Sequence, residues 1–240
     1  MTELTEDSFF QGELRVSQAR DGYRFSIDAI LLAATIETRP GEAVLDIGTG
    51  CGIIPLLLAF RHPDISIHAL EIQPELAKLA QKNVSDNKMA ARITITCADV
   101  RRLSDRTFEH PFDWVVSNPP YHRPFSGRLN PNHQRALARH EIMLDLDELL
   151  LCARRMLRTG GRLAMIYPAD RLSDLVAGMR QAGIEPKWLR TIHSQEGEEA
   201  RLALIKGVKA GKPGLRIAPP LIVYEPDGRY VEEVRKMMQP

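Results

Sequence analysis

The chain has 240 residues, a net charge of +1, 44% hydrophobic residues and 26% charged residues. This length is enough to bury the core of one large domain, and the composition is that of a globular protein in water. No apolar run approaches the about 20 residues that a membrane helix needs. The acidic stretch MTELTEDSFFQGEL lacks the apolar segment of a secretory signal peptide.

The cysteines and histidines bear on compartment and metal binding. Cys51, Cys97 and Cys152 are an odd number and form no C-x-x-C pair. This favours a reducing compartment over a disulfide framework or a zinc site. The seven histidines show no H-E-x-x-H pattern. We therefore expect a cytoplasmic protein without a metal.

Apolar periodicity and turn residues predict strands that alternate with helices along most of the chain. The expected helices cover residues 28–37, 53–60, 74–87, 146–157 and 172–181. Gly160-Gly161 is expected to end the fourth of these helices. The expected strands cover residues 43–46, 65–70, 93–97, 112–116, 163–167, 187–193 and 201–208.

This alternation predicts an α/β fold with a seven-stranded, mostly parallel sheet and helices on both faces. The last two strands have no helix between them, so we expect them to pair as an antiparallel edge. The whole chain, 1–240, is expected to be a single domain. In it, residues 1–40 are an N-terminal extension with its own helix, 41–208 the core and 209–240 a C-terminal tail.

A polar residue follows four successive expected strands: Asp46, Glu71, Asp99 and Asn118. Ligands in open α/β sheets bind at the carboxyl ends of the strands, so these side chains predict a binding site. The first strand leads into Gly48-Thr49-Gly50-Cys51-Gly52. Its glycines permit a tight turn and close approach of a ligand to the backbone.

The loop spacing is G-x-G-x-G, whereas a pyrophosphate-binding fingerprint is G-x-G-x-x-G. Asp46 at the mouth of the loop would repel a pyrophosphate and attract a cationic amino acid group. Glu71 is placed to accept two ribose hydroxyls, and Asp99 to accept an adenine amino group. This set suits S-adenosylmethionine (SAM). The alternatives are a glycine turn in a nicotinamide enzyme and a turn without a ligand.

These residues resemble the cofactor motifs of class I SAM-dependent methyltransferases, which implies a Rossmann-like fold. The resemblance implies cofactor contacts from the glycine loop and from the residues that follow the strands. The candidates are Asp46, Gly48, Gly50, Glu71, Ile72, Ala98, Asp99, Val100 and Asn118.

The stretch Ser117-Asn118-Pro119-Pro120-Tyr121 ends the fourth strand, because proline has no N–H for the ladder. An exocyclic amine is a poor nucleophile, since its lone pair is delocalised into the ring. The Asn118 side-chain oxygen and the Pro119 carbonyl could accept its two N–H groups. Tyr121 would offer a face on which a base stacks, worth about 1–3 kcal/mol.

This NPPY stretch resembles the motif of N6-adenine, N4-cytosine and glutamine-N5 methyltransferases, and it limits the acceptor to a planar amine or amide nitrogen. Asp21–Ala33, DGYRFSIDAILLA, is similar to the N-terminal motif of the bacterial tRNA1(Val) (adenine-37-N6)-methyltransferase family. Arg139-His140-Glu141, Gly211–Leu215 and Pro219–Tyr224 also resemble that family, and the resemblance extends from about Asp7 to Val234. It implies N6-methylation of the adenine at tRNA position 37, with Phe25 and Asp28 as further cofactor contacts.

Two segments free of acidic residues, 122–140 and 201–223, are candidates for contact with the RNA backbone. The candidate residues are Arg123, Arg128, Arg135, Arg139, His140 and Lys212. The alternative is two solvated loops that are balanced by acids elsewhere. An adenine turned out of its stack is easiest to obtain in a single-stranded loop, which favours tRNA as the partner.

Two other functions remain open at this stage. A glutamine-N5 methyltransferase acting on release factors could use the same NPPY site, but such enzymes usually carry a helical substrate domain before the SAM fold. The second is a non-catalytic RNA-binding protein with a SAM fold, against which the intact acidic set and NPPY argue. A DNA methyltransferase is disfavoured because no target-recognition domain is visible. We expect a monomer or a weak dimer.

Overall fold

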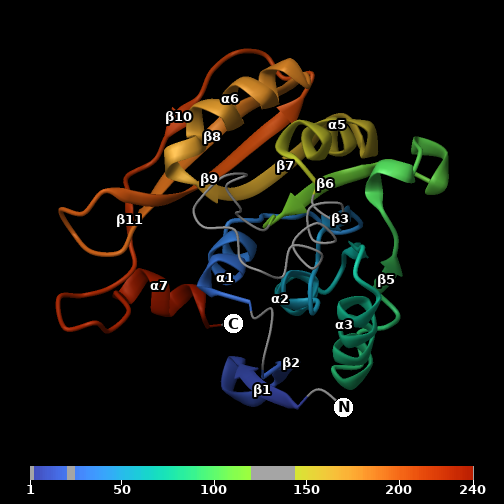
Figure 1. Cartoon of the computed structure of the whole chain (residues 1–240), viewed down its shortest axis with the longest axis horizontal. Helices are drawn as coiled ribbons and strands as arrows, with labels where there is room; N and C mark the ends of the chain where they lie inside the picture. Colours follow the sequence, from blue (N-terminus) through green and yellow to red (C-terminus); the bar gives the residue numbers. More distant parts are fainter. Residues whose placement is uncertain (1–2, 21–24, 120–143, 240) are drawn as a thin grey trace, which may run out of the picture.

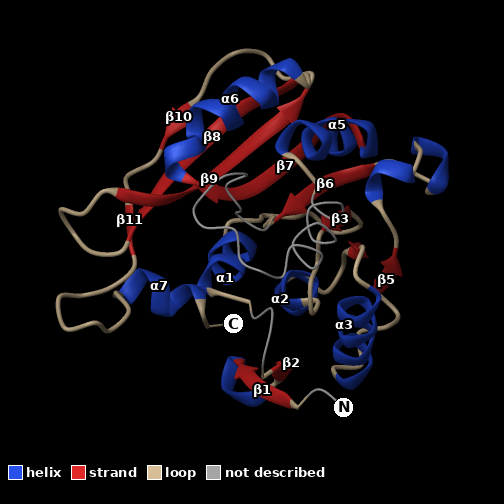
Figure 2. Cartoon of the chain, in the orientation of Figure 1, coloured by secondary structure: helices blue, strands red, loops and turns tan. Residues whose placement is uncertain are grey.

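The computed structural model describes residues 3–20, 25–119 and 144–239. A twisted, mostly parallel sheet forms the centre of the molecule, with helices on both faces (Figure 1 and Figure 2). Its strands are β3 (Ala43–Ile47), β4 (Ser66–Glu71), β5 (Ile93–Cys97), β6 (Phe112–Ser117), β7 (Leu157–Pro168), β8 (Ile184–His193), β9 (Ala200–Lys209), β10 (Arg216–Ile217) and β11 (Leu221–Ile222).

The described helices are α1 (Ile27–Ala34), α2 (Ile53–Arg61), α3 (Pro74–Asp86), α5 (Leu146–Met156), α6 (Leu172–Gln181) and α7 (Glu232–Met237). A separate two-stranded hairpin, β1 (Leu4–Phe9) and β2 (Leu14–Ala19), precedes α1. It lies beside α2 and α3, away from β8 and β9 (Figure 1).

Neighbouring residues of each central strand face opposite sides of the sheet, so the apolar strands feed two cores. Val44 and Val116 belong to the core under α1 and α2. Leu45 and Val115 belong to the core under α5 and α6. Burial on both faces explains why these strands are almost continuously apolar.

The α/β fold with a mostly parallel sheet and helices on both faces is confirmed, and all seven expected strands are present. The strand order is β10-β8-β9-β7-β6-β3-β4-β5, with β11 also paired to β8. β9 is antiparallel to both β7 and β8. The antiparallel strand is therefore not at the edge, because the β8–β9 hairpin folds β9 back between β8 and β7.

Two further features differ from expectation. The strands β10 and β11 extend the sheet from seven strands to nine within the described residues. The helix α5 ends at Met156, before Gly160-Gly161, and β7 runs through both glycines. The β6–β7 pairing shifts between Phe112 and Trp114, and Gly160 has φ of +76°. The glycines thus serve a bulge in a strand rather than a helix end.

The segment after β9 packs on the rest of the molecule. The Arg190 guanidinium donates to Glu233 at 2.6 and 2.8 Å and to the Pro219 carbonyl at 2.9 Å, which joins β8 to the C-terminal residues. The short helix α7 contacts α1. Among the helices described, none has the length and apolar character to cross a membrane.

A polar cluster lies at the amino ends of the central strands. Glu42 is 8% exposed and accepts hydrogen bonds from Trp114 Nε1 at 3.2 Å and from the Arg39 backbone N–H. Arg162 pairs with Glu42 and lies over the Trp114 ring. Removing the carboxylate would leave the indole N–H and the guanidinium without their acceptor.

We expect Glu42→Ala to lower the free energy of unfolding by about 1–3 kcal/mol, because it leaves these partly buried donors unpaired. The measurement is urea unfolding monitored by circular dichroism. Lys82→Ala is the control, since it removes only the exposed Lys82–Asp86 pair and should cost less than about 0.5 kcal/mol. Equal effects of the two substitutions would contradict the assigned role of Glu42.

Candidate active site

The strand register brings the predicted polar residues to one edge of the sheet. Asp46 pairs with Ala69 of β4 and with Val116 of β6. Glu71 therefore lies two residues beyond one partner, and Asn118 two residues beyond the other. Glu71 itself pairs with Cys97, which places Asp99 two residues past β5. The four strand ends thus meet at the carboxyl edge.

The glycine loop turns tightly at this edge. The backbone N–H groups of Gly48 and Thr49 both donate to the Leu70 carbonyl, at 2.9 and 3.0 Å. Gly48 has φ of +79°, and a Cβ built there would meet no atom within 4 Å. Gly52 differs, because a Cβ there would lie 3.2 Å from the Ala80 Cβ on α3. Gly48 thus faces open space, whereas Gly52 permits close packing.

Glu71 is 5% exposed, and its carboxylate supports the loop. Oε2 accepts the Gly50 N–H at 2.8 Å, and Oε1 accepts the Gln73 N–H at 2.9 Å. A carboxylate oxygen has a second lone pair, so these bonds leave capacity for the ribose hydroxyls predicted from the sequence. Glu71 therefore supports the loop and still has acceptor capacity for the predicted contact with the ribose hydroxyls.

Asp46 is completely buried, and in the described part of the chain neither of its carboxylate oxygens has a hydrogen-bond partner. Burial raises the pKa of Asp46 to about 7. The nearby Thr49 hydroxyl opposes part of this rise, although it is outside hydrogen-bonding geometry, and the negative charge of Glu71 adds to it. A buried carboxyl group without a partner is costly, and a cationic ligand would offset that cost.

These observations fit SAM. The unpartnered Asp46 carboxyl suits its positive charge, and the open side of Gly48 gives a ligand access to the backbone. An open cleft of about 750 Å³ lies at the residues that follow β4 and β5, and neither Asp46 nor Gly48 lines it. It is lined by Ile72, Cys97, Ala98, Asp99, Arg101, Arg102 and Leu103.

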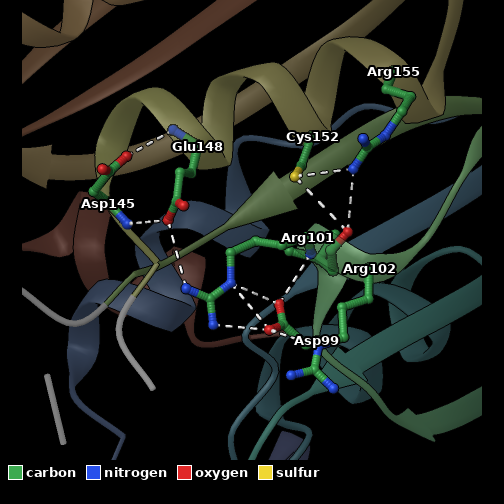
Figure 3. Close-up of polar contacts among 8 residues, drawn as sticks. Asp99, Arg101, Arg102, Asp145, Glu148, Cys152 and Arg155 are labelled. Carbon is green, nitrogen blue, oxygen red and sulfur yellow. Dashed lines mark hydrogen bonds and ion pairs between the residues drawn. The ribbon is translucent and has the colours of Figure 1, made fainter. Parts of the chain in front are cut away.

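Asp99 forms a pair that the sequence analysis did not anticipate. Arg101 holds its carboxylate with side-chain bonds of 2.8–3.0 Å and donates its backbone N–H as well. These contacts, led by the Arg101 side chain, lower the pKa of Asp99. Figure 3 shows Arg101 between Asp99 and Glu148 of α5, 3.7 Å from Glu148. Val100 packs in the core and does not line the cleft.

The segment before the glycine loop carries Phe25 and Asp28. The Phe25 ring packs against the core and lies 5.8 Å from the ring of Phe9. Its backbone N–H donates to Gln18 Oε1 at 3.2 Å. Asp28 is in the first turn of α1, and burial raises its pKa. The cofactor role of both residues remains a prediction.

The first half of the NPPY stretch is described. Ser117 is buried and donates its hydroxyl to the Ile47 carbonyl at 2.8 Å, which ties the end of β6 to the end of β3. Asn118 and Pro119 follow directly and are half-buried. The other predicted residues here lie outside the described residues: Pro120, Tyr121, Arg123, Arg128, Arg135, Arg139 and His140.

Lys212 lies away from the other candidates. It follows β9, whose last residue, Lys209, pairs with Ile184 at the start of β8. Its backbone carbonyl accepts a bond from Lys187 Nζ at 2.8 Å. Lys212 thus lies toward the amino ends of the parallel strands, opposite the edge that carries Asp46. The structure does not bring it together with the cofactor candidates.

Arg101 and Asn83 have roles in the site that are absent from the sequence predictions. The spacing Asp99-x-Arg101 is a signal that could have indicated a local ion pair. Asn83 is 1% exposed on α3, and a buried asparagine in a helix requires partners. No group of three or more His, Cys, Asp or Glu that could hold a metal is found in ranges 3–20, 25–119 and 144–239.

Comparison with known proteins gives a consistent result. The family model described as methyltransferase small domain matches residues 24–173. A protein of Porphyromonas gingivalis named tRNA1(Val) (adenine(37)-N6)-methyltransferase is 37% identical over 72% of this chain and 69% of its own length. A protein of the same name from Tolumonas auensis is 32% identical over 94% of this chain and 92% of its own.

Solved structures share the fold. A crystal structure from Agrobacterium tumefaciens, described as a predicted O-methyltransferase, superposes with a TM-score of 0.71 at 24% identity, covering 88% of this chain and 94% of the other. A putative RNA methyltransferase from Pyrococcus horikoshii gives 0.55 at 15% identity, covering 76% and 82%.

We expect Asp46→Asn to remove a pH-dependent loss of stability. Folded Asp46 keeps its proton up to about pH 7, whereas the unfolded chain loses it near its ordinary pKa of 3.8. The folded state therefore binds more protons between these values, and stability falls as pH rises through this range. The melting temperature without ligand should fall less for Asp46→Asn than for wild type between about pH 5 and about pH 8.

The same variant tests ligand binding. A cationic ligand favours ionised Asp46, so the affinity of wild type for SAM should increase as pH rises through about 7. Asp46→Asn should bind more weakly and without this dependence. Isothermal titration calorimetry at about pH 5 and about pH 8 measures the affinity of wild type and of the variant for SAM. An unchanged, equally pH-dependent affinity in the variant would contradict this role.

We expect Glu71→Gln to weaken SAM binding by about tenfold and to lower the unfolding free energy by about 1–2 kcal/mol. A glutamine amide has one acceptor oxygen, so it cannot accept from both Gly50 and Gln73. Calorimetry and urea unfolding measure the two effects. Glu75→Gln changes a carboxylate that is 90% exposed and serves as the control. A wild-type affinity in Glu71→Gln would show that the carboxylate does not organise the loop for the ligand.

Proposed function

This chain belongs to the methyltransferase small domain family and takes its methyl group from S-adenosylmethionine, and on that premise we propose that it methylates N6 of an adenine in tRNA. The observation that carries the proposal is the position of Asn118 and Pro119. They directly follow β6, whose Val116 pairs with Asp46 at the mouth of the glycine loop. This register supports the proposal that the motif binds a planar amine next to the cofactor.

The named relatives support the substrate. Both the Porphyromonas and the Tolumonas proteins carry a name that specifies the adenine at position 37 of tRNA1(Val). We extend that substrate to this chain, because the relation covers 94% of it in the second case. The adenine would have to leave its stack, which costs least in a single-stranded anticodon loop.

In the proposed reaction, the residues of this chain position the base rather than remove a proton from it first. The Asn118 side-chain oxygen and the Pro119 carbonyl accept the two N–H groups of the adenine amine. This holds the nitrogen lone pair toward the methyl group and away from the ring. SAM would supply a methyl group on a cationic sulfonium, so the neutral amine is a sufficient nucleophile. As the new nitrogen–carbon bond forms, the carbon–sulfur bond would break to leave S-adenosylhomocysteine, and the methylated nitrogen would then release its extra proton to water. Tyr121 stacks on the base.

The proposed cofactor contacts follow from the site. Asp46 neutralises the positive charge, Glu71 accepts the ribose hydroxyls, and Gly48 and Gly50 allow close approach of the ligand. Ile72 and Ala98 line the cleft and would contact the adenine of the cofactor there. Asp99 accepts the adenine amino group in place of one of its present bonds from Arg101, whose other bonds keep the carboxylate oriented.

We also propose a domain organisation, an RNA-binding segment, a cellular compartment and an oligomeric state. The chain acts as one methyltransferase domain, in which the helix of the N-terminal extension, residues 1–40, caps the cofactor. The arginines of segment 123–139 and His140 contact the RNA phosphates, and this contact weakens with salt. The enzyme works in the cytoplasm, where tRNA is modified, as a monomer or a weak dimer.

The test is transfer of a tritiated methyl group from SAM into total tRNA that lacks N6-methyladenine, followed by nucleoside mass spectrometry. We expect labelled N6-methyladenosine, and a loss of at least about a hundredfold in rate for Asn118→Ala, because one of two amine acceptors is removed. Asn130→Ala is the sequence-matched control, since Asn130-Pro131 is a second Asn-Pro pair. It should retain activity.

Transfer of the label to protein instead of tRNA would move the acceptor to a glutamine amide and overturn the RNA proposal. SAM binding without transfer to tRNA or protein would overturn the enzymatic proposal. Fragment mapping of the labelled tRNA identifies the position, and a site other than 37 would overturn only that assignment.

A further inference from the structure

The outer edge of the hairpin strand β2 is bonded to two asparagine side chains, those of Asn83 in α3 and of Asn87, the residue that follows α3 as its C-cap. Asn87 accepts the Arg15 N–H at 2.9 Å and donates to the Arg15 carbonyl at 2.6 Å. Asn83 accepts the Ser17 N–H at 2.9 Å and donates to the Ser17 carbonyl at 2.8 Å. Each amide thus replaces the backbone of a third strand.

The spacing of the two elements permits this match. Residues four apart in a helix are separated by about 6 Å along its axis. Residues two apart in a strand are separated by nearly the same distance, about 6.8 Å. Asn83 and Asn87 can therefore satisfy Ser17 and Arg15 together. Backbone groups that would otherwise form a free sheet edge are paired in this way.

Asn83 makes one contact that Asn87 does not. Its Nδ2 also donates to the carbonyl of Cys51 in the glycine loop, at 2.8 Å. Asn83 is 1% exposed and Cys51 2% exposed, so water cannot replace this bond easily. One buried amide thus links the N-terminal hairpin to the loop between Gly50 and Gly52.

The hairpin is linked on its other side to the segment that precedes α1. Gln18 is 2% exposed; its Oε1 accepts the Phe25 N–H at 3.2 Å, and its amide nitrogen donates to Asp7 on β1. Gln18 directly follows Ser17, which Asn83 holds. Hydrogen bonds therefore link Cys51 to Asn83 and Asn83 to Ser17, the peptide bond joins Ser17 to Gln18, and a further hydrogen bond links Gln18 to Phe25.

We propose that Asn83 is a positioning residue for the cofactor, which couples the glycine loop to the Phe25–Asp28 segment through the β1–β2 hairpin. This inference rests on the proposed function, because it assumes that both segments bind SAM. Asn83 does not touch the ligand. Its amide fixes the Cys51 carbonyl, and with it the direction of the neighbouring Gly50 and Gly52 backbone. The hairpin in turn fixes where the Phe25 backbone lies.

The first experiment compares Asn83→Ala with Asn87→Ala. Both variants remove a pair of bonds to β2, but only Asn83→Ala removes the bond to the glycine loop. We expect Asn83→Ala to raise the dissociation constant and the KM for SAM by about tenfold, equivalent to one buried hydrogen bond, with little change in kcat at saturating SAM. Asn87→Ala should change the dissociation constant and the KM for SAM by less than about threefold.

Direct binding by calorimetry separates this inference from the proposed function. SAM binding by wild type with equal affinities for the two variants would overturn the role of Asn83 and leave the proposed function standing. A fall in kcat with an unchanged KM would also overturn it, because a positioning role in cofactor binding acts on KM. Failure of wild type to bind SAM would overturn the proposed function and the inference together.

A second measurement needs no variant and is therefore independent of folding defects. Coupling between two sites is reciprocal, so a ligand at the glycine loop must stabilise the β2 edge that Asn83 holds. S-adenosylhomocysteine should slow amide hydrogen exchange at Ser17 more than at Arg15, whose partner, Asn87, does not contact the loop. Equal protection of the two amides would overturn the coupling.

Discussion

The attachment of the glycine loop to the end of β4 is the constraint on which the candidate site depends. The Leu70 carbonyl and the Glu71 carboxylate together accept three backbone N–H groups of this loop, those of Gly48, Thr49 and Gly50. These bonds fix the loop against the strand that supplies Glu71, while Ser117 ties β6 to β3 from the other side. Three neighbouring strands are held in register in this way. The glycine loop, Glu71 and the Asn118-Pro119 motif therefore keep fixed positions relative to one another.

The three acids at this edge are stabilised by different means. Glu71 is compensated by backbone N–H groups, and Asp99 by the Arg101 guanidinium. Asp46 has neither kind of partner among the described residues and keeps a raised pKa. Three ionised carboxylates without such compensation would repel one another. The arrangement leaves the uncompensated carboxyl at the mouth of the glycine loop, where a cation is proposed to bind.

Much of the fold follows from sequence periodicity, since the central strands are apolar on both faces and α3, α5 and α6 are amphipathic. The helix α2 differs, because it is apolar and buried almost throughout. The β1–β2 hairpin was missed because β1, LTEDSF, has few apolar residues and the edge of β2 is satisfied by the side chains of Asn83 and Asn87 rather than by another strand. Gly160-Gly161 was interpreted as a helix end, although the pair lies in a strand bulge. In the site, the rule that ligands bind at the carboxyl ends of parallel strands correctly predicted that Asp46, Glu71 and Asp99 lie at one edge of the sheet. It could not show that Asp99 faces Arg101, since that depends on side-chain rotamers.

The short strands β10 and β11 have a consequence for the behaviour of the protein in concentrated solution. They pair with β8 at Trp188-Leu189 and at Ile192-His193, on the side of β8 that β9 leaves open. An uncovered strand of that length is a template on which another chain can add its own strand. By pairing with β8, β10 and β11 thus oppose aggregation through this edge of the sheet. Proteolysis after Lys209 would remove these strands together with the core residues Leu221, Val223 and Val234, so a clipped chain would lose packing and expose the edge of β8 at the same time.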